Sequence, residues 1–355
     1  MILTFKIKHN RDFSNELLKA KQIAEFIVKN KENWNKSPTS KDVKHFGLKS
    51  IISNQIIRKY FRNKKIKSVK SVKLTIPKQG IKLDKENKEI YIPSLDFRFN
   101  YHYPKEFEKI NQIEINNKFV YVSVSVKEKG TIKTNNFIGI DLNTTGHIAV
   151  MSNPETGKVW KLGKKAKHIH QKYKDIRRKL QKKKQYKKLK KIKNKEKRII
   201  NDLNHKISKK IVDIAIENNS GIKLENLKGI RKNKKHRQEF NYYLNSWSFY
   251  QLQKYIEYKS NLNGVPITYV EPKNTSKECS RCGSIGIRET KTFKCPKCGH
   301  VDHADVNASF NIALRLPLME NIGQLHVDRD TCNGSTDTPK EATLRTTETL
   351  EPPML

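Results

Sequence analysis

Three acidic residues lie in settings that could gather them around metal ions. Asp141 and Glu225 end apolar runs typical of buried strands, whereas Asp305 opens a run typical of a helix. Two divalent cations about 4 Å apart need several carboxylate oxygens, and such a pair can hydrolyse a phosphodiester. We therefore predict that Asp141, Glu225 and Asp305 are catalytic ligands of two Mg²⁺ ions, with Mn²⁺ as an alternative. Asp302 is the rival third ligand, and Asp305 is preferred because a helix can begin directly after it.

Four cysteines predict a second metal site of a different kind. Cys279 and Cys282 form one Cys-x-x-Cys pair, and Cys295 and Cys298 form another after twelve intervening residues. Each pair can supply half of a tetrahedral Zn²⁺ shell, and a glycine after each pair suits the tight turn. Four thiolates leave no open coordination position, so this zinc ribbon would have a structural role.

The charge of the chain points to a nucleic-acid partner. Lys and Arg number 74 against 35 acidic residues, which gives a net charge of +39. A compact protein with that charge repels itself unless a polyanion neutralises it. A membrane partner is disfavoured, because the sequence contains neither a signal-peptide pattern nor an apolar run of about 18 residues.

The order of elements after residue 137 indicates a mixed α/β sheet of the ribonuclease-H type. The expected elements are a hairpin over 137–150 with Asp141 in its first strand, a strand within 157–162, helices to 217, a strand at 222–225, a helix at 247–262, a strand at 267–270 and a helix at 305–316. In such a sheet the three acids meet at one edge.

Residues 161–198 form a segment dominated by one sign of charge. They include 20 Lys or Arg residues and only two acids, with apolar residues at helical spacing. Solvated helices usually mix the two signs, so we expect one or two basic helices that contact phosphates.

The region before residue 130 combines helices with antiparallel strands. Residues 14–30, with Ser14 as the N-cap, 41–46 and 49–61 are predicted helices, whereas 66–130 alternates with period two. A strand over 2–8 could join a small β-barrel there, which would make 11–65 a helical insertion. The pattern leaves open whether that insertion binds nucleic acid or only packs as a bundle.

Five motifs together resemble the TnpB (OrfB) proteins, which insertion sequences of bacteria and archaea encode and which are relatives of type V CRISPR effectors. They are Gly-Ile-Asp-Leu-Asn at 139–143, Leu-Glu-Asn at 224–226, Thr-Ser-Lys-Glu-Cys-Ser-Arg-Cys-Gly at 275–283, Cys-Pro-Lys-Cys-Gly at 295–299 and Asp-Val-Asn-Ala-Ser at 305–309. The resemblance is specific over about 137–316 and rests on architecture upstream. One departure is His303-Ala304-Asp305, where the family often has Asp-Arg-Asp.

The resemblance implies a multidomain α+β fold. Its parts would be a β-barrel wedge domain (1–10 and 66–130), a helical recognition insertion (11–65), a RuvC-like nuclease domain (137–278 and 301–318) that includes the basic helices of 161–198, an inserted zinc ribbon (279–300) and a disordered tail (321–355).

The resemblance also implies an activity and partners. The chain would be an RNA-guided DNA endonuclease in the prokaryotic cytoplasm, associated with the nucleoid. Its guide RNA would come from the transposon end, and its target would be double-stranded DNA beside a short recognised motif. It would act as a monomer or as a homodimer on RNA, without a membrane partner.

Three alternatives remain open from the sequence. An RNA-guided DNA-binding repressor would bind without cutting, although the intact set of three acids argues against it. A minimal type V CRISPR effector would share the chemistry and differ in its genomic neighbourhood. A guide-independent junction resolvase would cut without RNA and would not need the zinc ribbon or so much positive charge.

Overall fold

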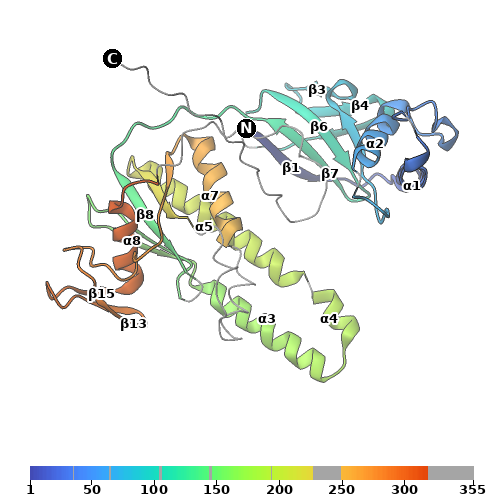
Figure 1. The fold of residues 1–355 in the computed structure, drawn as a ribbon. Coiled ribbons are helices and arrows are strands. Elements are labelled where there is room, and N and C mark those ends of the chain that lie inside the picture. The colour runs from blue at the N-terminus through green and yellow to red at the C-terminus, as the bar shows by residue number, and fades with distance from the viewer. Residues whose placement is uncertain are drawn as a thin grey trace, which may run out of the picture. The chain divides into compact units, whose positions relative to one another are not determined.

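The chain adopts a multidomain α+β fold in the computed structural model, which describes residues 1–34, 36–63, 65–103, 106–143, 146–192, 194–226 and 249–318 (Figure 1). These residues divide into two compact units, one formed by 1–5, 102–111 and 123–318 and the other by 6–101 and 112–122. The predicted tail over 321–355 lies outside the described residues. Among the helices described, none has the length and apolar character needed to cross a bilayer.

Two antiparallel sheets account for the period-two pattern before residue 130. The first has the order β1-β7-β6-β2 and the second the order β3-β4-β5. In β7 every second residue is buried, so the predicted alternation is confirmed there. The bounds are β1 Ile2–Lys8, β2 Leu74–Pro77, β3 Lys82–Asp84, β4 Glu89–Ile92, β5 Phe97–Asn100, β6 Lys109–Ile115 and β7 Phe119–Ser125.

Helices α1 (Ser14–Lys29) and α2 (Ser50–Arg62) pack against each other, and α2 also contacts β2. The prediction of Ser14 as the N-cap is wrong, since Ser14 begins the helix and donates its N–H to Asp12 Oδ1 at 2.9 Å. The helix predicted at 41–46 is also wrong, because only a 3₁₀ turn, η2, forms there. The short 3₁₀ turns are η1 Lys31–Asn33, η2 Lys44–Phe46, η3 Lys78–Gly80 and η4 Pro93–Leu95.

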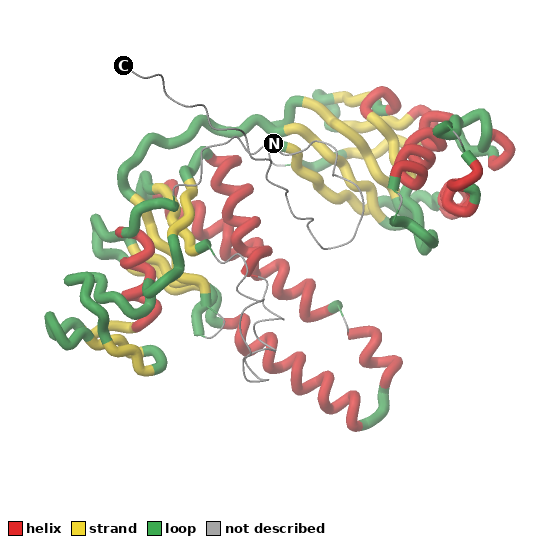
Figure 2. Tube along the Cα trace, viewed as in Figure 1, coloured by secondary structure: helices red, strands yellow, loops and turns green. Residues whose placement is uncertain are grey.

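A five-stranded mixed sheet lies in the larger unit and has the order β10-β9-β8-β11-β12 (Figure 2). Strands β10, β9 and β8 pair antiparallel, whereas β8, β11 and β12 pair parallel. Residues Ile140 and Leu224 are partners across the β8–β11 pair. The bounds are β8 Phe137–Leu142, β9 Ala149–Ser152, β10 Val159–Leu162, β11 Gly221–Glu225 and β12 Ile267–Val270.

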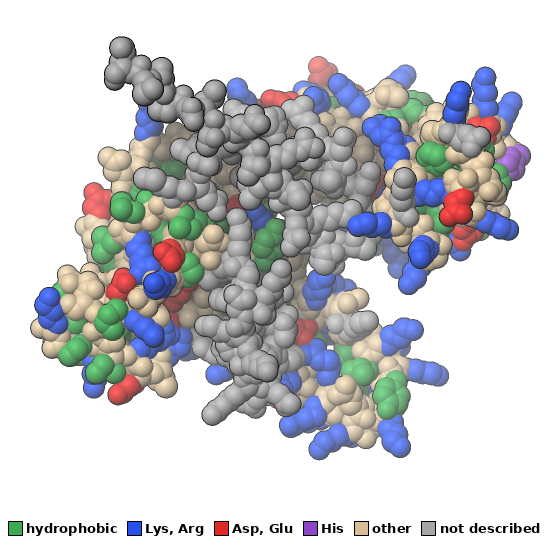
Figure 3. Space-filling model, viewed as in Figure 1, with side chains coloured by type: hydrophobic (Ala, Val, Ile, Leu, Met, Phe, Trp, Pro, Cys, Tyr) green, Lys and Arg blue, Asp and Glu red, His purple; other side chains and the backbone are tan. Residues whose placement is uncertain are grey.

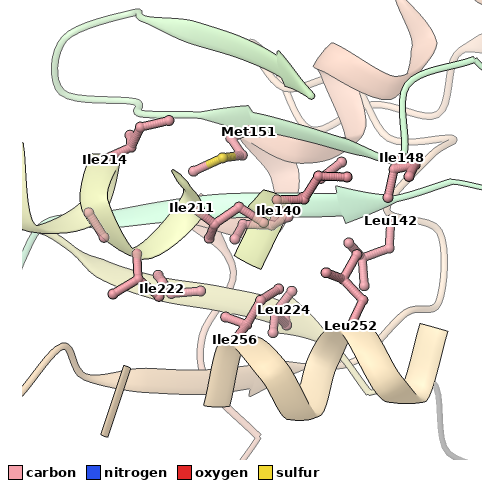
Figure 4. Close-up of a cluster of buried hydrophobic side chains, with 14 of the residues drawn as sticks. Ile140, Leu142, Ile148, Met151, Ile211, Ile214, Ile222, Leu224, Leu252 and Ile256 are labelled. Carbon is pink, nitrogen blue, oxygen red and sulfur yellow. The ribbon is translucent and has the colours of Figure 1, made fainter. Parts of the chain in front are cut away.

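Helices α5 (Lys195–Glu217) and α7 (Phe249–Asn263) pack on one face of this sheet. Their buried residues form one hydrophobic core with the strands (Figure 4). The labelled members of this core are Ile140, Leu142, Ile148, Met151, Ile211, Ile214, Ile222, Leu224, Leu252 and Ile256. Because Ile140 and Leu142 point into this core, the alternate residues of β8 face the other side of the sheet.

Helix α8 (Ala304–Leu314) covers that other side and contacts β8, β9 and β11. Gly139 permits its close approach, because a Cβ there would lie 2.1 Å from Ser309 O and 2.4 Å from Ala313 N. The buried Lys223 holds the end of the helix by donating from Nζ to Ala313 O at 2.8 Å and to Arg315 O at 2.6 Å. Strand β8 therefore has the core on one side and α8 on the other.

A small antiparallel sheet, β13-β14-β15, precedes α8 in the chain. The first cysteine pair comes before β13, and the second lies between β14 and β15. Its strands are β13 Ile287–Glu289, β14 Thr292–Lys294 and β15 Val301–His303. Three helical segments form an arm, which we call the basic arm. They are α3 (Lys165–Lys182), α4 (Tyr186–Ile192) and the start of α5, and α5 packs against α3.

Candidate metal centres

The fold brings the three predicted acids to one end of the five-stranded sheet. Asp141 lies near the end of β8, and Glu225 is the last residue of β11, the parallel neighbour of β8. Asp305 is the second residue of α8, which packs against β8. Asp141 is 9% exposed and Asp305 is 1% exposed. Segments at least 80 residues apart in the chain thus bring their carboxylates into one region.

Burial is the main influence on the pKa of two of these acids. Burial, together with the negative charges of Glu225 and Asp305, raises the pKa of Asp141 to about 7. Burial likewise raises the pKa of Glu225, although the Thr275 hydroxyl, which donates to Glu225 Oε1 at 2.5 Å, opposes this rise. Asn143 Nδ2 donates to Asp141 Oδ2 at 2.8 Å. A cation bound between these carboxylates would stabilise their ionised forms and so offset the rise in pKa.

Two basic side chains of the β13–β14 hairpin neutralise Asp305. Arg288 Nη2 lies 3.3 Å from Oδ1, and Lys291 Nζ lies 2.6 Å from Oδ2. Sequence reasoning missed both, as it missed Thr275 and Asn143, because no local pattern links these residues to distant acids. These two positively charged side chains explain why the Asp305 carboxylate can be buried without an unpaired charge.

Asp302 is placed differently from its rival. Its Oδ1 accepts the His303 N–H at 2.6 Å, and its side chain is 31% exposed. The Nδ1 of His303 accepts the Asp305 N–H at 3.3 Å as the N-cap of α8. Asp305, and not Asp302, is among the charges that raise the pKa of Asp141.

The four cysteines converge as the spacing predicts. Within the described part of the chain, they are the group of potential metal ligands whose donor atoms all lie within 4.8 Å of one another, and the three acids do not form so tight a group. The Sγ atoms of Cys279 and Cys298 are 3.6 Å apart, and those of Cys282 and Cys295 are 3.5 Å apart. Tetrahedral Zn²⁺ with bonds of about 2.3 Å requires sulfur separations of about 3.8 Å. The site therefore fits a four-coordinate metal.

The two cysteine turns have the backbone that such a centre needs. Gly283 and Gly299 lie in the left-handed region with φ of 72° and 71°, and their N–H groups donate to the Cys279 and Cys295 carbonyls. The backbone N–H and the hydroxyl of Ser284 lower the pKa of the Cys282 thiol to about 6. The thiolate form that binds metal is thus favoured there.

The basic arm is built around one buried acid. Glu196 of α5 accepts from His170 Nδ1 at 2.6 Å and from Arg177, both on α3, which ties the two helices together. Most lysines of the arm, among them Lys182, Lys183 and Lys187, are exposed, and Lys and Arg side chains surround the tip of the arm (Figure 3). The segment is therefore folded, with an exposed basic surface.

A pH-dependent loss of stability follows from the buried carboxyl of Asp141. The pKa of this group rises from an ordinary 3.8 to about 7 on folding, so the folded state holds its proton more tightly than the unfolded state. Its stabilising contribution is complete below about pH 4 and is lost as pH rises towards 7. In metal-free protein, this group should lower the free energy of unfolding by roughly 2–3 kcal/mol between pH 5 and pH 8.

Urea denaturation of the wild type and of Asp141→Asn in the presence of a chelator measures this effect. Asparagine cannot ionise, so the variant should lose less stability over the same pH interval. If the free energy of unfolding changed with pH by the same amount in the two proteins, a raised pKa of Asp141 would be contradicted.

Known proteins include several that are similar to this chain. Residues 249–312 match the family model of the Cas12f1-like TNB domain. A TnpB-like protein of Methanocaldococcus jannaschii is 35% identical over 218 residues, which cover 59% of this chain and 69% of that protein. A CRISPR-associated endodeoxyribonuclease Cas12f1 of Sulfoacidibacillus thermotolerans is 39% identical over 115 residues, 31% of this chain and 26% of that protein. A solved complex of Cas12f1 with sgRNA and target DNA aligns with a TM-score of 0.44 and 22% identity, and covers 88% of this chain and 99% of that one.

The fold and the site define a multidomain α+β protein in which a four-cysteine centre precedes helix α8, and α8 packs on a mixed five-stranded sheet. The chain belongs to the family of TnpB-like proteins.

Proposed function

We propose that this chain is an RNA-guided DNA endonuclease that cuts with a RuvC-like site. The observation that carries the proposal is the placement of Asp141, Glu225 and Asp305 on two parallel neighbouring strands and on the helix packed against them. The strand order β10-β9-β8-β11-β12 supports a ribonuclease-H type domain. Membership of the TnpB-like family supports the activity, since its Cas12f relatives are named as endodeoxyribonucleases.

In this proposal the three acids are the catalytic ligands of two Mg²⁺ ions, with Mn²⁺ as a substitute. When bound, the metals would activate a water molecule and stabilise the leaving oxygen of the phosphodiester. The hydrogen bonds from Asn143 to Asp141 and from Thr275 to Glu225 orient two of the acids. Arg288 and Lys291 pair with Asp305, and their positive charges would also stabilise the negative charge of a phosphate bound beside it.

The remaining parts of the chain would hold nucleic acid. The proposed domains are the wedge barrel of 1–10 and 66–130, the recognition insertion of 11–65, the RuvC-like domain of 137–278 and 301–318, and the Zn²⁺-bound ribbon of 279–300. The proposed partners are a guide RNA from the transposon end and double-stranded target DNA, bound by one or two copies of the chain. Base pairing would read the target, while the protein would read a short flanking motif.

A direct test is to purify the full chain with the RNA that it retains in cells and to sequence that RNA. Double-stranded DNA that matches the guide segment of the RNA is then supplied. Cleavage should require the RNA, the matching sequence and Mg²⁺, and a chelator should stop it. Cleavage without RNA would favour a junction resolvase. Stable RNA-dependent DNA binding without any cut would favour the repressor, and the absence of a discrete bound RNA would overturn the proposal.

The exposed lysines of the basic arm should determine part of the salt dependence of binding. Each phosphate contact contributes about 0.7–0.9 to the slope of log affinity against log salt. The double variant Lys182→Gln and Lys187→Gln should therefore lower this slope by about 1–2, for RNA or for DNA. Lys206 and Lys210 pair with Asp202 and Glu217, so Lys206→Gln with Lys210→Gln is the matched control and should change the slope little. Equal slopes for the arm variant and the wild type would refute the assignment.

A further inference from the structure

Asn307 joins the first cysteine pair to helix α8. Its side chain is fully buried, two residues after Asp305. Its Oδ1 accepts the N–H of Ser280 at 2.9 Å, and its Nδ2 donates to the carbonyl of Glu278 at 2.7 Å. Ser280 lies inside the turn between Cys279 and Cys282. One amide therefore uses both of its ends to bind the chain that forms half of the four-cysteine centre.

The same stretch of chain reaches a second acid. Asn311, one turn further along α8, donates from Nδ2 to the carbonyls of Thr275 and Glu278 at 2.8 and 2.7 Å. The hydroxyl of Thr275 in turn donates to Glu225 Oε1 at 2.5 Å. Residues 275–280 thus connect the cysteine centre both to the helix that carries Asp305 and to Glu225.

The ribbon also contacts Asp305 from its other end. Arg288 and Lys291 of the β13–β14 hairpin pair with the two carboxylate oxygens of Asp305. A hairpin this short, between the two cysteine pairs, has little core of its own, and Phe293, Cys279, Cys295 and Ala304 make up its buried cluster. A metal bound by the four thiolates would therefore order the ribbon. Through Arg288 and Lys291, the ordered ribbon would then fix the position of the Asp305 carboxylate.

We infer that Asn307 is a positioning residue that couples metal occupancy of the four-cysteine centre to divalent-metal binding by Asp141, Glu225 and Asp305. The inference rests on the proposed function, since that proposal assigns metals to both centres. An amide is the side chain that the place requires, because one end must accept an N–H and the other must donate to a carbonyl. A carboxylate could make only the first of these bonds and would face the Glu278 carbonyl with a negative charge.

The test measures Mn²⁺ binding to the full chain by electron paramagnetic resonance, with and without Zn²⁺. Mn²⁺ prefers oxygen ligands, so it reports on the acids and not on the thiolates. Removing Zn²⁺ from the wild type should weaken Mn²⁺ binding roughly tenfold, a size typical of coupling between sites and of outer-shell partners. Asn307→Ala should weaken it by a similar factor even with Zn²⁺ bound, and subsequent removal of Zn²⁺ should have little further effect.

Two further variants accompany Asn307→Ala. Asn307→Asp keeps the acceptor for Ser280 but loses the donor and places a negative charge against the Glu278 carbonyl, so it should weaken Mn²⁺ binding at least as much as Asn307→Ala. Asn263→Ala is the matched control, because Asn263 Nδ2 donates to Lys259 O within α7 at 2.8 Å, away from the ribbon. It should retain both the wild-type Mn²⁺ affinity and the effect of removing Zn²⁺.

The outcomes separate this inference from the proposed function. If the wild type binds Mn²⁺ and Asp305→Ala does not, the acid site stands. Within that case, equal effects of Zn²⁺ removal on the wild type and on Asn307→Ala would overturn the coupling alone, and so would wild-type Mn²⁺ affinity in Asn307→Ala. If the wild type binds no Mn²⁺, or Asp305→Ala binds it equally well, the proposed function itself fails.

Discussion

Replacing Asp305 by alanine should reduce DNA cleavage by at least about a thousandfold, while Asp302→Ala should retain activity within about tenfold. The reason is placement. Asp305 is 1% exposed and interacts with the charge of Asp141, whereas Asp302 is partly exposed and accepts a backbone N–H at the start of α8. Asp141→Ala should match Asp305→Ala, because both would lose a ligand of the same metal pair.

The measurement is single-turnover cleavage of a guide-matched duplex by RNA-loaded protein, with DNA binding measured in parallel. The inactive variants should keep RNA-dependent DNA binding, since the acids carry none of the positive charge that binds phosphates. Asp202→Ala is a control, because Asp202 is exposed and pairs with Lys206 on α5. Full activity of Asp305→Ala together with loss of activity in Asp302→Ala would exchange the roles of the two acids.

A single methyl group at Gly139 should displace α8 and with it Asp305. The added Cβ would lie 2.1 Å from Ser309 O and 2.4 Å from Ala313 N, both backbone atoms that cannot move without moving the helix. Overpacking that forces backbone to shift typically costs about 1–3 kcal/mol. Gly139→Ala should therefore lower the free energy of unfolding by that amount and reduce cleavage by at least about a hundredfold.

Gly130→Ala is the matched control, since nothing lies within 4 Å of a Cβ at that position. It should change neither the denaturation midpoint nor the cleavage rate appreciably. Both quantities are measured for the two variants by urea denaturation and single-turnover cleavage. Wild-type stability and cleavage in Gly139→Ala would mean that α8 does not pack on β8 as closely as described.

Much of the fold around the site could be predicted because the signals are local. The apolar runs that became β8, β11 and β12 and the helical run that became α8 are continuous in sequence, so periodicity and length identified them. Errors occurred where a few residues decide between similar local structures. The region 41–46 forms only a 3₁₀ turn at Lys44–Phe46, and α1 begins at Ser14 without using its side chain as a cap.

By itself the sequence determined the kinds of chemistry this protein can carry. The spacing of Cys279, Cys282, Cys295 and Cys298 defined a four-thiolate centre, because each pair closes its own turn, and Asp141 and Glu225 ended recognisable strands. The excess of positive charge indicated a polyanionic partner, because the net charge of a chain does not depend on its fold.

Only the tertiary structure decided which groups lie together. It buried Asp305 where its charge affects Asp141, paired Arg288 and Lys291 with Asp305, and directed the amide of Asn307 at the first cysteine turn. It also explained Gly139, whose missing side chain is needed by a helix 170 residues further along the chain. These contacts depend on how strands and helices pack, and side-chain partners that are distant in the chain leave no trace in local spacing.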